Sequence, residues 1–290
     1  MNGPAHVPAA AATAVEDRVA KTIREEILAT TSYATAKPAG MIELHANENP
    51  WPLPASLRGE LAAALAEAAV NRYPEGAGEG VKRALAAALP IPAGAAIVLG
   101  NGSDELIQVI TAAVARPGAA VLAPDPTFVM YRIYAAQSAV RFVPVPLRAD
   151  FTLDEDAFDA ALRRERPALV WLASPNNPTG RALPLASIER ILAAAPGLVV
   201  VDEAYADFAG TTLLPRVLEF PNLVVLRTLS KIGLAGARLG YAVGHPAWIA
   251  ELDKVRKRAA RDVDQARRRG VERLAGEPLA VLDSLEMGSE

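Results

Sequence analysis

Seven short apolar runs, separated mostly by segments of helix length, constrain the fold of this chain more than any other feature. Each run is apolar throughout rather than alternating, which is typical of strands buried on both faces. Their order predicts an α/β domain of three layers, in which a mostly parallel seven-stranded sheet carries helices on both faces. The runs are Ile97–Leu99, Ala120–Ala123, Val140–Val145, Ala168–Ala173, Leu198–Val201, Leu223–Leu226 and Leu239–Val243.

The unusual polar and glycine-containing segments of the chain come directly after these apolar runs. Ligands of open α/β sheets bind at the carboxyl ends of the strands. We therefore expect one site, built from several of these segments, at that edge of the sheet. The segments are Gly102-Ser103-Asp104-Glu105, Pro126-Thr127-Phe128, Asn177-Pro178-Thr179-Gly180, Asp202-Glu203-Ala204-Tyr205 and Ser230-Lys231.

Composition argues against several classes of function. The 30 basic and 33 acidic residues leave a formal charge of −3, so no overall field favours nucleic acid or a membrane surface. The chain has no cysteine, and its three histidines do not stand at a metal-ligand spacing. No apolar run reaches the length of about 18 residues that a transmembrane helix needs. We expect a cytoplasmic globular protein with no metal, no nucleic-acid partner and no membrane partner.

The segment from Ala96 to Leu106 reads as a strand, a tight glycine turn and the start of a helix. Free backbone N–H groups and the helix dipole could hold a phosphate there, the dipole adding about 0.3–2 kcal/mol. Simple helix capping by Ser103 explains the same residues. A dinucleotide-binding fingerprint is disfavoured because Glu105 stands where its third glycine is required.

The remaining segments are ambiguous when each is taken alone. Asn177-Pro178-Thr179-Gly180 is a common turn sequence, and Asp202-Glu203-Ala204-Tyr205 is an ordinary end of a strand. A single lysine is most often a solvated surface charge. Lys231, however, follows Thr228-Leu229-Ser230 and precedes a glycine-spaced stretch ending at Arg238, which brings hydroxyls, an amine and a guanidinium together.

Taken together, in this order and each after a separate strand, these motifs resemble the fold-type I pyridoxal-phosphate-dependent aminotransferases, specifically the histidinol-phosphate aminotransferase family. The resemblance runs from about Met41 to Arg256. It implies an N-terminal leader and arm at 1–40, of which we expect 1–13 to be disordered, and a large domain binding the cofactor at 41–256. Residues 257–290 form a divergent basic tail, predicted to be helical, where the family has its small C-terminal domain.

The resemblance also implies an activity and a cofactor. The family exchanges an amino group between L-histidinol phosphate and 2-oxoglutarate through a Schiff base of pyridoxal 5'-phosphate, in histidine biosynthesis. Lys231 matches the lysine that attaches the cofactor and moves the substrate Cα proton, and Asp202 matches the partner of the pyridine nitrogen. Tyr205 and Asn177 match residues that hydrogen-bond the phenolic oxygen of the cofactor, and Phe128 matches the aromatic residue stacked on its ring.

Further positions are implied for the phosphate, the partner subunit and the substrate. Tyr73 matches a tyrosine that reaches the phosphate from a neighbouring subunit, which implies a homodimer. Asn49 and Tyr33 match positions facing the substrate. The phosphate contacts carried over from the family are Ser103, Asp104, Thr228, Ser230 and Arg238.

Three alternatives remain open at this point. The chain could be a truncated, catalytically impaired homologue that binds the cofactor, or an aminotransferase for a related amine or aromatic amino acid. It could also bind a phosphate or dinucleotide without lysine chemistry. The basic tail is either a solvated amphipathic helix or a replaced C-terminal region. Its acidic residues Asp262, Asp264 and Glu272 disfavour binding of nucleic acid.

Overall fold

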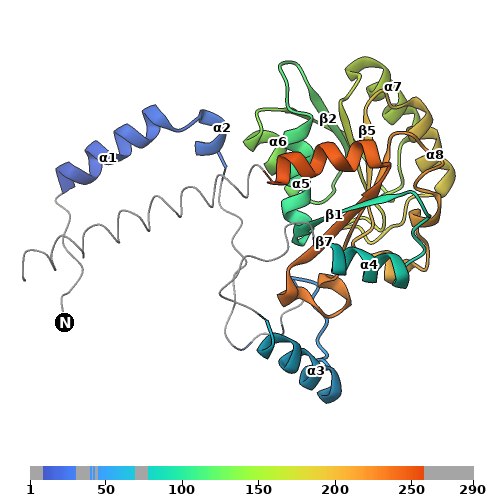
Figure 1. Ribbon diagram of the computed structural model, residues 1–290. Coiled ribbons are helices and arrows are strands. Elements are labelled where there is room, and N and C mark those ends of the chain that lie inside the picture. The colour runs from blue at the N-terminus through green and yellow to red at the C-terminus, as the bar shows by residue number, and fades with distance from the viewer. Residues whose placement is uncertain (1–8, 31–39, 41, 43–44, 69–77, 258–290) are drawn as a thin grey trace, which may run out of the picture.

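A seven-stranded mixed sheet forms the centre of the computed structural model, which describes residues 9–30, 40, 42, 45–68 and 78–257 (Figure 1). The strand order is β1-β7-β6-β5-β4-β2-β3. Strand β7 is antiparallel to both of its neighbours, and the other pairs are parallel. The strands are β1 (Ala96–Asn101), β2 (Ala120–Asp125), β3 (Arg141–Pro146), β4 (Leu169–Ala173), β5 (Leu198–Asp202), β6 (Leu223–Thr228) and β7 (Leu239–Gly244).

Each apolar run of the sequence corresponds to one of these strands, so the predicted three-layer α/β fold is confirmed. Buried side chains alternate between two separate core clusters, one on each face of the sheet. In β5, Val199 and Val201 face one cluster, whereas Leu198 and Val200 face the other. This arrangement explains why the strands are apolar throughout, since both of their faces are covered.

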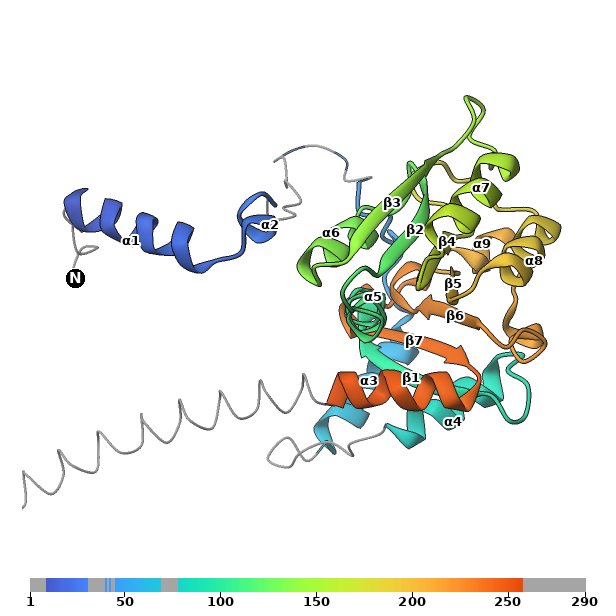
Figure 2. The ribbon, with the colours of Figure 1, turned by 90° about the horizontal axis from the view of Figure 1, so that it is seen from above.

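Helices cover both faces of the sheet, as Figure 2 shows. Helices α4 (Glu79–Ala88), α7 (Glu155–Glu165) and α8 (Leu185–Ala194) contribute buried residues to the first cluster. Helices α5 (Gly102–Ala113) and α6 (Met130–Gln137), with the helical residues 246–257 after β7, supply the second. The second face matters most for the site. Asp202, the last residue of β5, lies on the same face of the strand as Leu198 and Val200, so its side chain points to the side of the sheet covered by α5 and α6.

The strand directions bring the polar segments to one edge of the sheet. Strands β1 to β6 run the same way, so their carboxyl ends meet there. Strand β7 runs the opposite way and therefore starts at this edge, directly after Arg238. The residues that precede β7 thus join those that follow β1, β5 and β6.

The N-terminal part differs from the expectation in one respect. Residues 1–13 were expected to be disordered, but residues 9–13 belong to α1 (Ala9–Thr22), because alanine has the highest helix propensity of all residues. Helix α1 lies apart from the sheet domain in both views (Figures 1 and 2). Helices α2 (Glu25–Leu28) and α3 (Ala55–Ala66) contain no buried residue. In the part of the chain that the structure describes, no helix is long and apolar enough to cross a membrane.

Candidate active site

A cleft of about 370 Å³ opens at the carboxyl edge of the strands. Its wall contains every residue predicted to contact a cofactor, except Tyr73, which lies outside the described residues together with Tyr33. The segment before the sheet, residues 45–48, forms one side of the cleft. The predicted residues in the wall are Ser103, Asp104, Phe128, Asn177, Asp202, Tyr205, Thr228, Ser230, Lys231 and Arg238.

Asp202 is a buried carboxylate at the end of β5, with 5% of its surface exposed. The Tyr131 hydroxyl donates a hydrogen bond to Oδ2 over 2.7 Å, and the Ala204 N–H donates one to Oδ1 over 3.0 Å. Burial raises the pKa of Asp202 to about 6, although both hydrogen bonds and Lys231 act in the opposite direction. The carboxylate is therefore held in place and poorly solvated, so it will pair strongly with a cation presented from the cleft.

Tyr131, in α6, is a residue of this site that the sequence analysis missed. Its ring is fully buried and stacks on Trp171 of β4, with 4.7 Å between the ring centroids and 3° between their planes. Phe128 packs edge-on against the same ring at 5.7 Å. Burial, followed by the charge of Asp202, raises the pKa of Tyr131 well above its ordinary value, so the hydroxyl keeps its proton and acts as a donor.

Lys231 lies in the short helix η2 (Ser230–Ile232), directly after β6. Its Nζ donates a hydrogen bond to the backbone carbonyl oxygen of Ala46 over 2.9 Å, and it lies 5.6 Å from the centre of the Tyr205 ring. The amine is half-buried in the wall of the cleft that also contains Asp202. The structure thus places the predicted amine and the predicted acid in one cavity.

Tyr205 precedes the short helix α9 (Ala206–Ala209), and its hydroxyl faces the segment before the sheet. The Asn47 side-chain amide donates a hydrogen bond to the Tyr205 oxygen over 3.0 Å. Because Tyr205 is the acceptor in this bond, its own proton remains available for a ligand atom in the cleft. Asn47, which the sequence analysis passed over in favour of Asn49, adopts a left-handed φ of 51°.

An ionic network centred on the buried Arg227 holds the loop that carries Tyr205. Arg227 of β6, only 4% exposed, places Nη2 2.6 Å from Asp207 Oδ1 and Nε 3.8 Å from Glu203 Oε2. Glu203 also accepts a hydrogen bond from the Leu213 N–H at 2.6 Å. Burial is the main cause that raises the pKa of Glu203. Arg227 therefore contacts the loop two residues before and two residues after Tyr205.

The turn between β1 and α5 is shaped to bind an anion. Gly102 begins α5 with φ of 76°, and the N-cap residue is Asn101, so Ser103 lies inside the helix and does not cap it, contrary to the interpretation of Ser103 as a simple helix cap. The Gly102 N–H donates to the Arg238 carbonyl over 2.6 Å. The Arg238 guanidinium lies 3.6 Å from Asp104 Oδ2.

The Arg238 guanidinium also covers Gly102, where a Cβ would come within 2.5 Å of Nη2. The hydroxyls of Thr228 and Ser230 share a hydrogen bond of 3.0 Å in the wall of the same cleft. The amides of Ser103 and Asp104 in the first turn of α5, two hydroxyls and one guanidinium are donors suited to a phosphate group.

The loop after β4 brings Asn177 into the wall of the cleft through its neighbour Asn176. Asn176 is buried, accepts a hydrogen bond from the Thr127 hydroxyl over 2.8 Å and donates one to the Pro126 carbonyl over 3.0 Å. The loop after β4 is therefore tied to the loop after β2, which carries Phe128. The predicted turn is present, and it is also part of the site.

Asn49, predicted to face the substrate, does not line the cleft. Its side-chain oxygen accepts a hydrogen bond from the Trp51 N–H over 2.9 Å, and its amide nitrogen would lie 3.1 Å from a Cβ on Gly233. The residue therefore lies beside the segment that follows Lys231. Its role toward a substrate stays a prediction.

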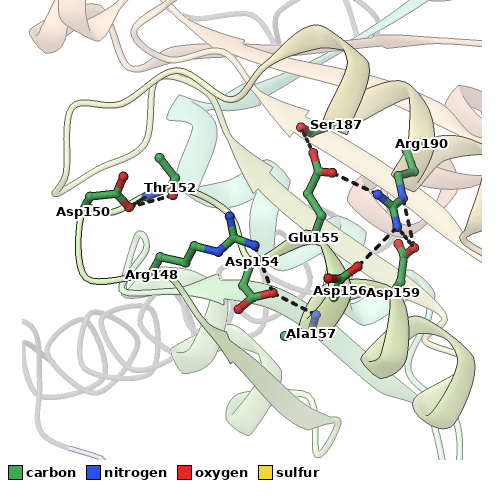
Figure 3. Close-up of polar contacts among 10 residues, drawn as sticks. All are labelled: Arg148, Asp150, Thr152, Asp154, Glu155, Asp156, Ala157, Asp159, Ser187 and Arg190. Atoms are coloured by element: carbon green, nitrogen blue, oxygen red, sulfur yellow. Dashed lines mark hydrogen bonds and ion pairs between the residues drawn. The ribbon is translucent and has the colours of Figure 1, made fainter.

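A larger cavity, of about 500 Å³, lies by the loop between β3 and α7. Figure 3 shows charged residues at and beside this cavity: Arg190 of α8 contacts Glu155 and Asp159 of α7, the first pair at 2.9 Å. Arg148 lies 3.7 Å from Asp154. This cluster joins α7 to α8, and Arg181 also lines the cavity.

Comparison with known proteins places these features in a wider group. A family model described as aminotransferase class I and II matches residues 39–262. A histidinol-phosphate aminotransferase of Chromobacterium violaceum is 57% identical over 82% of this chain and 67% of its own length. Histidinol-phosphate aminotransferase 1 of Ralstonia nicotianae is 50% identical over 83% of this chain and 66% of its own length.

A solved structure gives the same result. The crystal structure of histidinol-phosphate aminotransferase from Sinorhizobium meliloti in complex with pyridoxal-5'-phosphate matches with a TM-score of 0.63 and 34% identity. The match covers 72% of this chain and 57% of that one. The chain spans about two thirds of the length of the curated relatives it matches.

Proposed function

Because this chain belongs to the class I and II aminotransferase family, as a homologue of histidinol-phosphate aminotransferases, we propose that it transfers an amino group between L-histidinol phosphate and 2-oxoglutarate, using pyridoxal 5'-phosphate. One observation carries the proposal. The buried carboxylate of Asp202 and the amine of Lys231 open into one cleft, next to a turn suited to a phosphate. In pyridoxal phosphate, a carboxylate can pair with the ring nitrogen, and an amine can form a Schiff base with the aldehyde.

The residues of the cleft fit this cofactor group by group. The amides at the start of α5, with Ser230, Thr228 and Arg238, offer donors for its phosphate. Among the described residues, Asp202 is the only buried acid in the wall of the cleft, and it can pair with the ring nitrogen of the cofactor. Phe128 offers an aromatic face, and Asn177 and Tyr205 offer donors for its phenolic oxygen.

When bound, pyridoxal phosphate would supply a ring that accepts negative charge from the Cα of the amino substrate. Asp202 holds a proton on the ring nitrogen through a charge-assisted hydrogen bond. The Nζ of Lys231 takes the Cα proton and returns it, and a positioned general base of this kind contributes about 10²–10⁴-fold to the rate. Tyr205 donates its free proton toward the cleft while Asn47 holds its oxygen.

The same proposal includes a homodimer, because Tyr73 matches a family residue that reaches the phosphate of a neighbouring subunit. It also includes residues 41–256 as the cofactor-binding domain, residues 257–290 as a separate tail, and a cytoplasmic place suited to histidine biosynthesis. Asn49 and Tyr33 remain proposed substrate contacts. All of these follow from the family resemblance.

Reduction of the protein with borohydride after addition of pyridoxal phosphate tests the cofactor part of the proposal. We expect a stable adduct that peptide mass mapping assigns to Lys231. Lys231→Ala should abolish this adduct, whereas Lys254→Ala, which removes an exposed lysine in the helix after β7, should leave it unchanged. An adduct spread over several lysines, or absent, would contradict the proposal.

Half-reaction spectroscopy tests the substrate part. We expect L-histidinol phosphate to convert the aldehyde form of the cofactor to its amine form, and 2-oxoglutarate to restore the aldehyde. Conversion by an aromatic amino acid alone would instead indicate a related aminotransferase. An adduct on Lys231 with no conversion by any amino donor would identify a cofactor-binding homologue without turnover.

A further inference from the structure

The hydrogen bond from Tyr131 to Asp202 joins two residues that are 71 positions apart and both deeply buried. Tyr131 comes from α6 and Asp202 from the end of β5, and the distance between Oη and Oδ2 is 2.7 Å. A hydrogen bond of this length to a carboxylate is in the charge-assisted range. The sequence assigned Tyr131 no role, because a tyrosine in an amphipathic helix usually serves only the core.

The ring of Tyr131 cannot easily move away from Asp202. It lies flat on Trp171, which is two residues before Ala173 on β4, and Ala173 pairs in register with Asp202 on β5. Trp171 and Asp202 therefore lie on the same face of adjacent strands, and a ring stacked on the first reaches the second. Phe128 also packs against the Tyr131 ring in a T-shaped contact, with 5.7 Å between the ring centroids.

The carboxylate itself has few other partners. Oδ1 accepts the Ala204 N–H at 3.0 Å, which leaves Tyr131 as the only side-chain donor to Asp202 among the described residues. The adjacent strands contribute the apolar residues Ala173 and Leu226 on either side. The ionisable groups around the carboxyl are Asp104 of α5, Lys231 of η2, and Glu203 and Tyr205 of its own loop.

From this geometry we propose that Tyr131 is a positioning residue for Asp202, one that fixes the plane of the carboxylate and stabilises its charged form in a buried place. With one donor on each oxygen, rotation of the carboxyl group would break both hydrogen bonds. The remaining lone pairs of Asp202 then face the cleft in one orientation. The consequence for a cofactor rests on the proposed function, but the effect on the carboxyl group itself does not.

Titration of Asp202 in the full chain without added cofactor tests the proposal. The protein is labelled with ¹³C at the aspartate side-chain carboxyl, and Asp202→Asn identifies the resonance. We expect Tyr131→Phe, which keeps the ring stacked on Trp171, to raise the pKa of Asp202 by about one to two pH units, because a hydrogen bond to its charged form is lost. Tyr134→Phe, the same change one helical turn away in α6, should leave that pKa unchanged.

An unchanged pKa of Asp202 in Tyr131→Phe, or equal shifts in both variants, would overturn the proposal. Circular dichroism and thermal melting of both variants separate a loss of folding from a local effect, and Trp171→Phe serves as a second test if Tyr131→Phe does not fold. Trapping of pyridoxal phosphate on Lys231 is measured independently. A shift in the pKa of Asp202 without a cofactor adduct on Lys231 would contradict only the proposed function. An adduct without a shift would contradict only the role of Tyr131.

Discussion

Asn47 donates a hydrogen bond to the hydroxyl oxygen of Tyr205 over 3.0 Å, and so joins the segment before the sheet to the loop after β5. The neighbouring residue Ala46 accepts a hydrogen bond from Lys231 at 2.9 Å. Consecutive residues of one segment thus contact two polar side chains of the cleft wall, Tyr205 and Lys231. This segment is part of the site, and the direction of the Asn47 bond sets the direction in which Tyr205 can donate.

Asn47→Asp should lower turnover with L-histidinol phosphate by about tenfold. The aspartate tolerates the left-handed φ of 51°, but it can only accept, so Tyr205 would donate to it instead of to a ligand. The loss of one hydrogen bond to a ligand corresponds to about 0.5–1.5 kcal/mol. Single-turnover absorbance measurements would give the rate.

Asn49→Asp is the matched control for that change, since Asn49 lies outside the cleft wall and bonds only to the Trp51 N–H among the described residues. A larger effect at Asn49 than at Asn47 would favour the substrate contact predicted for Asn49. An unchanged turnover in Asn47→Asp would show that the bond between Asn47 and Tyr205 is not needed.

Gly240→Ala should destabilise the protein and weaken phosphate binding at the turn between β1 and α5. A Cβ at Gly240 would lie 2.4 Å from the carbonyl carbon of Gly102 and 2.5 Å from the Ser103 nitrogen, so the turn would have to move. Overpacking of this kind costs about 1–3 kcal/mol. Urea unfolding and pyridoxal phosphate titration would measure the two effects.

Gly236→Ala offers the comparison for Gly240→Ala, because a Cβ there meets no atom of the described residues within 4 Å. We expect its free energy of unfolding to stay within about 0.5 kcal/mol of the wild type, as for most surface changes. Equal stabilities for the two alanine variants would show that the β1–α5 turn accommodates the added methyl group.

The sequence predicted the sheet and most of the cleft because both depend on local signals. Strands buried on two faces are apolar throughout, and the carboxyl ends of such strands place Asp202 and Lys231 at one edge. Tyr131 escaped prediction because Tyr131 and Tyr134 look alike in the sequence of α6. Only the tertiary position separates the two, since Tyr131 is fully buried against Trp171 and Asp202.

Asn47 escaped prediction for a different reason. Asn47 and Tyr205 are 158 positions apart in the sequence. Their contact also depends on the left-handed backbone conformation of Asn47, which no neighbouring motif predicts. Lys231 was predicted as part of a pattern, but its hydrogen bond to the backbone of Ala46 involves an atom that every residue type possesses. A hydrogen bond to a backbone atom cannot be predicted from the type of the residue that accepts it.

Arg227→Met should destabilise the protein by about 3–5 kcal/mol, because it leaves Glu203 as a buried charge without its cationic partner. Tyr205 lies between the two acids that Arg227 contacts, so the loss of Arg227 should also reduce the yield of the Lys231 adduct. Urea denaturation measures the first effect, and borohydride trapping measures the second.

Arg132→Met, which breaks an exposed pair with Asp125, should cost less than about 1 kcal/mol and serves as the control for Arg227→Met. A small effect at Arg227 would indicate that Glu203 takes up a proton on losing its partner. In that case the stability of Arg227→Met should fall with rising pH more steeply than that of the wild type.

Asp202→Asn should stabilise the protein without cofactor at neutral pH while it abolishes most of the turnover. Burial is the largest cause that raises the pKa of Asp202, from 3.8 to about 6, so the folded protein binds a proton more tightly than the unfolded chain. Stability from this group is complete below pH 4 and is lost as the pH rises through 6. The asparagine carries no charge, and its single side-chain oxygen can accept from either Tyr131 or the Ala204 N–H, so it keeps one of the two hydrogen bonds.

The stability of Asp202→Asn relative to the wild type should therefore rise with pH, by about 2–3 kcal/mol between pH 4 and pH 7. Urea unfolding at several pH values measures it, with Asp156→Asn, at an exposed carboxylate in α7, as the control. An advantage that is constant with pH would mean that Asp202 is solvated in the folded state. A stability advantage of Asp202→Asn that grows with pH would mean instead that the buried charge of Asp202 destabilises the folded protein and is retained for its role in the cleft. Such a cost in stability is usual for residues of an active site.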